Sequence, residues 1–237
     1  HRDLHSFPTR RSSDLTRRLV DASLAHGVER FVHCSSVGVY GTIPLELPAT
    51  VATPMNGDNA YHTSKIDAEK QVREGVVRGL NAVIVRPSIT YGEGDTGFPR
   101  TLVRLVKARC LPIPAKDIQV HLLEVSSLAR LVTEVLFSNR PWPRVVLAAD
   151  EAPVSLSELV NRIHEHYHES LYPQQLRLPA AVFRGAAMFF GLCGSHKWLT
   201  RVQLVSKSWC FDISETTAFY DYGPVSTLEA FVRAMCP

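Results

Sequence analysis

The sequence has no apolar run of the roughly 18 residues that a membrane-spanning helix needs. It has no CxxC pair, and its five cysteines are an odd number that cannot all pair with one another. The sequence has no large excess of positive charge, since 26 Lys and Arg stand against 23 Asp and Glu. These features argue against a stable membrane span, a disulfide framework and nucleic-acid binding. We expect a globular, cytoplasmic protein with free thiols.

Residues 1–15 (HRDLHSFPTRRSSDL) follow neither a helical nor a strand period, and they are rich in Arg and Ser. They also lack the apolar centre of a signal peptide. The segment looks like translated sequencing-adapter DNA, and the alternative is a natural disordered tail. We therefore expect residues 1–15 to be a non-native or disordered tail, and the chain to be the C-terminal part of a longer protein.

From residue 16 onward, strand-like and helix-like patterns alternate. Strands are predicted at 31–34, 81–86, 120–124 and 144–148, and helices at 16–27, 59–79, 98–108, 126–138, 155–168, 179–192, 214–220 and 226–235. This alternation predicts an α/β fold with a doubly wound parallel sheet over residues 16–150, including a substrate-side loop at about 88–120. Helices dominate after residue 150, so we expect a smaller, mostly helical substrate-binding lobe over residues 151–237.

Three polar residue types form a pattern suited to proton transfer. Ser35-Ser36 follow a predicted strand, and Tyr61 and Lys65 lie one turn apart at the start of a predicted helix. An ammonium about 4 Å from a phenolate stabilises it by about 4 kcal/mol at an effective dielectric constant near 20. Tyr61 could then act as an acid or base near neutral pH, with Ser36 holding the substrate oxygen. Alone, the YxxxK spacing is also typical of an ordinary surface pair on a helix.

Three sequence blocks in order strengthen this interpretation: GVERFVHCSSVGVYG, YHTSKIDAEKQV and NAVIVRPSITYGEGD. Together they resemble the extended short-chain dehydrogenase/reductase family, also called the NAD-dependent epimerase/dehydratase family. The resemblance covers about residues 16–235. It implies a partial Rossmann-like sheet, NAD or NADP as cofactor and a small-molecule substrate. It also implies a possible homodimer formed through the helices at 16–27 and 59–79.

The resemblance assigns a role to each matching residue. Tyr61 would be the acid/base, Ser36 would orient the substrate oxygen, and Lys65 would bind the nicotinamide ribose and favour the tyrosine phenolate. Pro87, together with the backbone of Ser88 and Ile89, would line the nicotinamide. Tyr61 and Lys65 thus count both as catalytic and as cofactor-binding residues.

The sequence also departs from the family pattern. The family's glycine-rich phosphate loop, GxxGxxG, is not found, so we expect this chain by itself to hold NAD(P) weakly and to be inactive. Ile89 and Val120 stand where nucleotide-sugar members usually carry Asn and often Arg, and neither side chain can donate a hydrogen bond to a phosphate. We therefore expect an oxidoreductase acting on a relatively apolar, hydroxysteroid-like alcohol or ketone. The alternatives are a nucleotide-sugar epimerase/dehydratase and a non-catalytic nucleotide-binding or scaffold protein.

Three further motifs have competing interpretations. Gly92–Gly97 spells GxGxxG, but its two carboxylates would repel a pyrophosphate. His164–His168 spells HExxH, yet no third ligand motif follows, so we expect no metal site and a polar helix end instead. The apolar helix at 179–192, with Phe189-Phe190, would suit a substrate pocket or lid, packing on the second lobe, or a membrane-surface patch.

Overall fold

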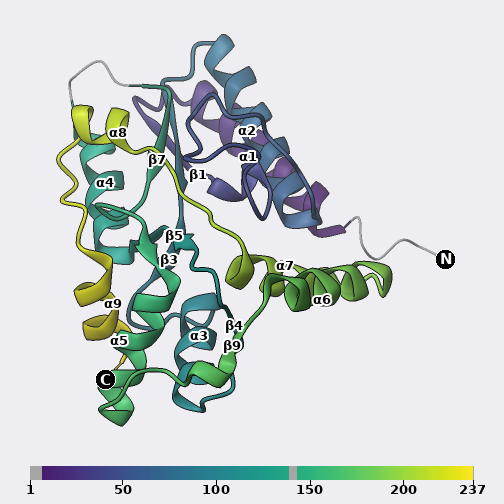
Figure 1. Cartoon of the computed structure of the whole chain (residues 1–237). Coiled ribbons are helices and arrows are strands. Elements are labelled where there is room, and N and C mark those ends of the chain that lie inside the picture. Colours follow the sequence, from purple (N-terminus) through teal and green to yellow (C-terminus); the bar gives the residue numbers. More distant parts are fainter. Residues whose placement is uncertain (1–6, 139–142, 237) are drawn as a thin grey trace. The chain divides into compact units, whose positions relative to one another are not determined.

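The computed structural model describes residues 7–138 and 143–236 (Figure 1). Its α-helices are α1 (Phe7–Ala25), α2 (Ala60–Val77), α3 (Phe98–Lys107), α4 (Val125–Phe137), α5 (Leu156–His168), α6 (Ala180–Leu192), α7 (His196–Ser206), α8 (Ser214–Phe219) and α9 (Thr227–Met235). Its strands are β1 (Phe31–Cys34), β2 (Ala82–Pro87), β3 (Ile89–Tyr91), β4 (Ile113–Pro114), β5 (Gln119–Val120), β6 (Leu122–Glu124), β7 (Val145–Ala148), β8 (Val154–Ser155) and β9 (Arg177–Leu178). Two short 3-10 helices are η1 (Val37–Tyr40) and η2 (Gln174–Leu176).

The chain divides into two compact units. Unit 1 comprises the described residues up to Ser88 with Leu128–Ala148 and Asp212–Gly223, and unit 2 comprises Ile89–Ser127, Ala149–Phe211 and the described residues from Pro224 onward. This differs from the two consecutive domains that we expected to meet at residue 150. The reason is that β4 and β5 pair with the later strands β9 and β8, which draws residues 89–127 into unit 2.

Unit 1 is built on a parallel sheet in the order β1-β2-β7, so the expected α/β sheet is confirmed. Cys34 pairs with Val85, and Arg86 pairs with Leu147, which aligns the carboxyl ends of the three strands. All residues of β2 are buried, as its nearly continuous apolar run predicts for a central parallel strand. Figure 1 shows α1 and α2 on one face of this sheet and α4 and α8 on the other.

The first helix begins at Phe7, nine residues before the start that we predicted at residue 16. Pro8 is compatible with a helix here because the first turn does not use the N–H that proline lacks. Residues 7–15, which we expected to belong to a non-native or disordered tail, are thus helical in this structure, and their non-native origin stays a prediction. Residues 1–6 of the same segment lie outside the described residues. Farther along α1, Val20 packs against Val72 and Ile84 in the core of unit 1.

Unit 2 joins three small two-stranded sheets to a group of packed helices. β3 pairs with β6 and β4 with β9 in parallel, while β5 pairs with β8 in the antiparallel sense. Ser155 caps α5 by accepting a hydrogen bond from the Glu158 N–H at 3.0 Å, as its sequence predicts. Helices α3, α5 and α9 contact one another, and α9 also contacts β3 and β6. No helix in the described part of the chain is both long enough and apolar enough to cross a bilayer.

Candidate active site

The predicted catalytic residues gather at the carboxyl end of β1. The N–H of Ser35 donates to the carbonyl of Val85 at 2.8 Å, which continues the β1–β2 ladder by one residue before the chain turns into η1. In open parallel sheets, ligands bind outside the carboxyl ends of the strands. Within unit 1, Pro87 is the last residue of β2, and Ser36 and Ser88 lie just beyond the carboxyl ends of β1 and β2.

Helix α2 presents Tyr61 and Lys65 to this same edge. The Lys65 ammonium donates to the carbonyl of Cys34, the last residue of β1, at 3.1 Å. Its nitrogen lies 5.9 Å from the centroid of the Tyr61 ring. The Tyr61 side chain is 55% exposed, so its hydroxyl can meet a bound molecule. The structure therefore brings the predicted pair together, with the ammonium tied to the sheet rather than to the phenol.

The loop after β1 and the start of α2 are in direct contact. Ser36 caps η1, with its Oγ accepting a hydrogen bond from the Gly38 N–H at 3.0 Å. A Cβ built on Gly38 would stand 3.2 Å from Ser36 Oγ and only 2.5 Å from Cδ2 of His62. Only glycine leaves room for His62 at this point. Because His62 follows Tyr61 directly, this close approach ties the position of Tyr61 to the Ser36 loop.

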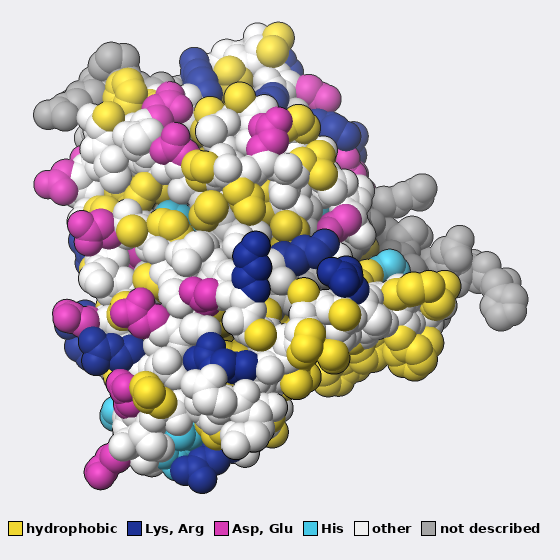
Figure 2. Space-filling model, in the orientation of Figure 1, with side chains coloured by type: hydrophobic (Ala, Val, Ile, Leu, Met, Phe, Trp, Pro, Cys, Tyr) yellow, Lys and Arg dark blue, Asp and Glu magenta, His cyan; other side chains and the backbone are white. Residues whose placement is uncertain are grey.

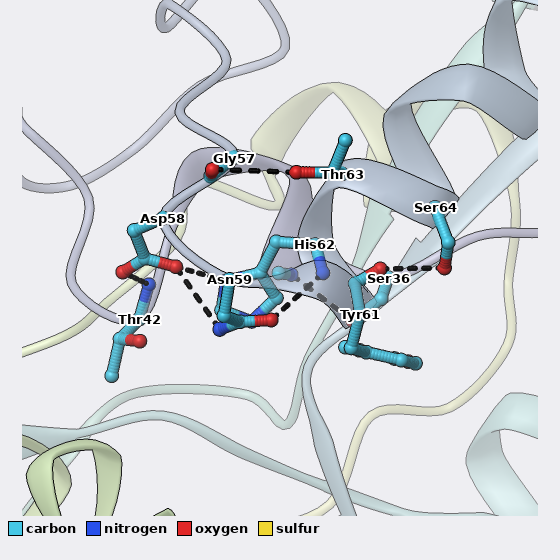
Figure 3. Close-up of polar contacts among 10 residues, drawn as sticks. Ser36, Thr42, Gly57, Asp58, Asn59, Tyr61, His62, Thr63 and Ser64 are labelled. Atoms are coloured by element: carbon cyan, nitrogen blue, oxygen red, sulfur yellow. Dashed lines mark hydrogen bonds and ion pairs between the residues drawn. The ribbon is translucent and has the colours of Figure 1, made fainter. Parts of the chain in front are cut away.

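A second set of polar contacts fixes the first turn of α2 (Figure 3). Asn59 caps the helix by accepting from the His62 N–H at 3.0 Å, and its amide nitrogen lies 2.8 Å from His62 Nδ1. Nδ1 of His62 also contacts the carboxylate of Asp58, which accepts from the Thr42 N–H at 2.8 Å. Burial opposes ionisation of Asp58, but the hydrogen bonds from Thr42 and His62 outweigh it and lower its pKa. These hydrogen bonds thus connect the loop that contains Thr42 to the first turn of α2 and hold the two in a fixed position.

Beneath this surface lies a buried polar network that sequence reasoning missed. Arg86 donates from Nε to Glu69 Oε1 at 2.9 Å and from Nη2 to Oε2 at 2.7 Å. Ser35 Oγ donates to Glu69 at 2.6 Å, and Arg86 Nη1 reaches the Tyr40 hydroxyl at 2.5 Å. Arg73 adds a second cation 3.1 Å from Glu69. Burial opposes ionisation of Glu69, but Arg86, Ser35 and Arg73 outweigh it and lower the pKa of this carboxyl.

The sequence carried a signal for this network. Arg86 ends an otherwise apolar run that predicts a strand buried on both faces, and a buried cation requires a partner. Ser35, Tyr40 and Glu69 belong to the sequence blocks that carried the family resemblance. They are thus structural supports of the site, and Ser36, the neighbour of Ser35, is the serine left at its surface.

His33 lies on β1 next to Cys34. Burial, followed by the nearby Lys65 charge, lowers the pKa of His33 to about 4. The imidazole is therefore neutral at pH 7. His33 is thus poorly suited to deliver a proton near neutral pH.

The predicted nicotinamide-side residues end in different surroundings. Pro87 and Ser88 are buried at the end of β2, and the Ser88 N–H donates to the carbonyl of Ala148 at 2.8 Å. That N–H is therefore committed to the sheet and cannot also bind a ligand. Ile89 is half-buried and begins β3, where it pairs with Leu122 of unit 2.

The glycine-rich segment Gly92–Gly97 does not form a phosphate cradle. Asp95 accepts hydrogen bonds from the N–H groups of Gly97 at 3.1 Å and Arg100 at 3.0 Å. The protein's own carboxylate thus occupies the donors at the start of α3 that an incoming phosphate would need. Gly92 has a φ of 157°, and a Cβ there would meet Val125 Cγ1 at 2.4 Å.

The histidines of the HExxH motif are engaged in packing and backbone contacts. His164 is 1% exposed, and its Nδ1 lies 2.7 Å from the carbonyl of Ser170. His168 Nε2 lies 2.9 Å from the carbonyl of Lys107. Arg109 Nε donates to His164 Nε2 at 3.3 Å. These contacts favour the polar helix end over metal ligation, because a bound metal would need the same ring nitrogens.

Comparisons with known proteins agree with the sequence blocks. The model of the NAD dependent epimerase/dehydratase family matches residues 9–122. A UDP-glucose 4-epimerase of Vibrio cholerae is 27% identical over 219 residues, which is 90% of this chain and 64% of that protein. The chain thus spans a little under two thirds of this curated relative.

Solved structures share the fold at low sequence identity. UDP-glucuronic acid 4-epimerase from Bacillus cereus, solved with NAD, has a TM-score of 0.70 at 14% identity over 92% of this chain and 64% of that one. RMD from Pseudomonas aeruginosa, solved with NADPH, has a TM-score of 0.66 at 17% identity over 93% of this chain and 70% of that one. The expected partial Rossmann-like fold is therefore confirmed. Residues 9–122, a little under half of the chain, match the NAD-dependent epimerase/dehydratase family.

Proposed function

We propose that this chain carries the proton-transfer site of an NAD- or NADP-dependent enzyme that interconverts a secondary alcohol and a ketone. The observation that carries the proposal is the arrangement of Tyr61 and Lys65. The tyrosine is exposed, the ammonium is 5.9 Å from its ring, and the same ammonium is anchored to the last residue of β1. Ser36 lies in the loop that follows this strand.

Each of these three side chains has a distinct role in the proposed reaction. Tyr61 takes the proton from the substrate hydroxyl in oxidation and returns it in reduction. Lys65 supplies a positive charge 5.9 Å from the Tyr61 ring, which offsets the negative charge that develops there during proton transfer. Ser36 Oγ accepts a hydrogen bond from Gly38, so its own hydrogen can be donated to the substrate oxygen. Bound nicotinamide would supply the hydride acceptor or donor.

The residues at the strand ends fit the nicotinamide end of the cofactor better than its phosphates. Lys65 can reach a ribose hydroxyl, whereas Pro87 is buried in this structure and would need to become accessible to contact the ring. The Ser88 N–H does not contribute, because it is bonded to Ala148. The segment that matches the GxGxxG motif offers no phosphate cradle, since Asp95 accepts from the N–H groups of Gly97 and Arg100. The pyrophosphate would need a glycine-rich loop that this sequence does not contain.

Two substrate classes remain in the proposal. The apolar residues Ile89 and Val120 favour a hydroxysteroid-like alcohol, but Val120 is only 1% exposed and pairs with Val154. Its apolar character is therefore explained by packing, which weakens that line of argument. The 27% identity to a UDP-glucose 4-epimerase supports a nucleotide sugar. We give nucleotide sugars first place and apolar secondary alcohols second.

The test is the Tyr61→Phe variant of the protein that carries this chain. Loss of a general acid/base lowers kcat by about 10²–10⁴-fold, while the dissociation constant for NAD(P) changes little. Turnover is measured with UDP-glucose and with a hydroxysteroid, so that the two substrate classes are compared directly. Tyr167→Phe, on helix α5, is the matched control and keeps full activity. Retained turnover in Tyr61→Phe would refute the proposal.

The non-catalytic alternative predicts a different result. A scaffold protein would bind nucleotide but show no turnover that depends on Ser36, Tyr61 or Lys65. The expectations of a cytoplasmic enzyme and of a homodimer through α1 and α2 remain part of the proposal. Light scattering of the purified protein measures the second of these directly.

A further inference from the structure

Helix α6 is apolar on every side, but much of it faces solvent. Its sequence, AAVFRGAAMFFGL, contains one charged residue, Arg184, and no other polar side chain. Phe183 is its one buried residue. Large apolar side chains on its outward face are 49–79% exposed: Val182 49%, Met188 69%, Phe189 61% and Leu192 79%. A helix that is hydrophobic all round normally packs against another apolar phase.

Helix α7 forms a hairpin with α6 and covers only part of it. Cys193–Ser195 link the two helices, and the ring of Phe190 stacks on Trp198 with centroids 6.0 Å apart. Trp198 is itself 50% exposed, and the Arg201 guanidinium lies 5.0 Å from its ring centroid. Figure 2 shows hydrophobic side chains gathered over this hairpin. We call residues 180–206 the apolar hairpin.

The charges around the apolar hairpin have one sign. From residue 170 to residue 211 the sequence contains no Asp or Glu. The same stretch contains five basic residues: Arg177, Arg184, Lys197, Arg201 and Lys207. Two of the exposed ones, Arg184 and Lys197, lie on α6 and α7 themselves. The partner that complements this surface is therefore both apolar and negatively charged.

We propose that the apolar hairpin docks on the surface of an anionic lipid bilayer. Met188, Phe189 and Leu192 would enter the boundary between headgroups and acyl chains, and the basic side chains would meet the lipid phosphates. Trp198 combines an apolar ring with a polar N–H, which suits the same boundary. With 13 residues, α6 is about 20 Å long, so it lies on the bilayer and does not cross its roughly 30 Å core.

A second copy of the chain is a poorer partner for this surface. An isologous contact would bring two identical faces together, each carrying basic side chains and no acid within residues 170–211. Like charges facing each other across an interface oppose association. An anionic bilayer offers the opposite charge together with an apolar interior. The charge pattern therefore selects the lipid surface.

The experiment is sedimentation of the purified protein with two kinds of vesicle. One kind is phosphatidylcholine alone, and the other is an equal mixture of phosphatidylcholine and phosphatidylglycerol. We expect binding to the mixed vesicles, weakening as salt is raised because the lipid charges are screened. Trp198 fluorescence shifts to shorter wavelength on binding, and Trp198→Phe loses this shift.

Matched variants distinguish binding through the apolar hairpin from non-specific adsorption of the protein to lipid. Phe189→Asp lowers the affinity for mixed vesicles by about tenfold or more, because the phenyl group that would enter the bilayer is replaced by a charge. Phe137→Asp is the control, since Phe137 on α4 is 78% exposed and outside the hairpin. Arg184→Gln with Lys197→Gln weakens binding by about fivefold for each charge removed. Circular dichroism verifies that every variant is folded.

Three results would overturn the proposal. The first is equal sedimentation of the unaltered protein and the folded Phe189→Asp variant. The second is equal binding to vesicles with and without phosphatidylglycerol at low salt. The third is a dimer that Phe189→Asp dissociates, in a protein that does not bind vesicles. None of these measurements depends on turnover, so they stand apart from the test of Tyr61.

Discussion

Arg86 and Glu69 form a bidentate ion pair, buried beneath the carboxyl end of β1, which Ser36 follows. The guanidinium Nε and Nη2 lie 2.9 and 2.7 Å from the two carboxylate oxygens, and both side chains are at most 1% exposed. Because Glu69 belongs to α2 and Arg86 to β2, the pair fastens the helix that carries Tyr61 and Lys65 to the sheet. The Ser35 hydroxyl extends the same contact to the end of β1.

The first prediction concerns this pair. Glu69→Gln removes the negative charge and leaves Arg86 buried without compensation, so the free energy of unfolding falls by about 3 kcal/mol. Urea unfolding measures the change. Glu74→Gln, an exposed position on the same helix, is the control and stays within about 0.5 kcal/mol. A double replacement of Glu69 and Arg86 by Leu restores much of the loss. An unchanged urea midpoint in Glu69→Gln would count against the proposed role of the Glu69–Arg86 pair in fastening α2 to the sheet.

The second prediction concerns the contact between Gly38 and His62. Gly38→Ala introduces a Cβ 2.5 Å from the His62 ring, so the first turn of α2 must shift. We expect a loss of about 1–3 kcal/mol in stability and a fall in turnover, because Tyr61 moves with His62. Adding His62→Ala to Gly38→Ala relieves the clash and recovers stability. Gly185→Ala, where the added Cβ meets open space in a helix, is the control and slightly stabilises the protein.

The third prediction concerns the pH dependence of stability in unit 2. Burial raises the pKa of Asp150 to about 6 from an ordinary value of 3.8, although the hydroxyls of Tyr91 and Thr227 and the Glu124 N–H donate to it. The folded state therefore holds this proton more tightly than the unfolded chain. The corresponding stability is fully present below about pH 4 and is lost as the pH rises through about 6, amounting to about 3 kcal/mol.

Asp150→Asn tests this pH dependence, because the amide does not titrate. Between pH 4 and 7 the unaltered protein loses unfolding free energy that the variant keeps. The variant is therefore more stable relative to the unaltered protein at pH 7 than at pH 4. Denaturant unfolding across this pH range gives the curve. Asp117→Asn, at an exposed position of the same unit, serves as the control. A difference that stays constant with pH would show that Asp150 does not titrate in this window.

The fourth prediction concerns the cofactor. Lys65 and Tyr61 offer contacts to the nicotinamide end, but Asp95 already occupies the N–H groups of Gly97 and Arg100, and the sequence lacks the family's GxxGxxG phosphate loop. We therefore expect this chain by itself to bind NAD(P) with a dissociation constant well above the micromolar range. Titration calorimetry measures it, and Tyr61→Phe changes it little. A low-micromolar dissociation constant would contradict the prediction. It would indicate that other residues of this chain bind the pyrophosphate.

Sequence patterns predicted the elements whose signals are local. The run at 81–86 predicts a strand buried on both faces, and Ser155 predicts the start of α5, because both depend on near neighbours in the chain. Helix α7 was missed, since its residues mix Thr, Val and charged side chains without a clear apolar period and Ser195 makes no capping hydrogen bond. The division into units was also missed, because it depends on pairings between distant short strands.

The same distinction applies to the candidate site. The i, i+4 spacing brings Tyr61 and Lys65 to one helix face without further information. The carbonyl partner of Lys65 and the position of His62 against Gly38 depend on how α2 packs against the end of β1. No pattern in the sequence alone indicates contacts of this kind. Arg86 did carry a signal, because a cation in a buried strand requires a partner, but the sequence does not say which acid supplies it.

Lys65 is held by a backbone carbonyl and not by a side chain. Any amino acid at position 34 supplies the same acceptor, so replacing Cys34 leaves the ammonium anchored. Cys34 is also exposed. Position 34 is therefore a suitable attachment point for a spectroscopic reporter that would follow events at this strand end without removing one of the groups proposed to act there.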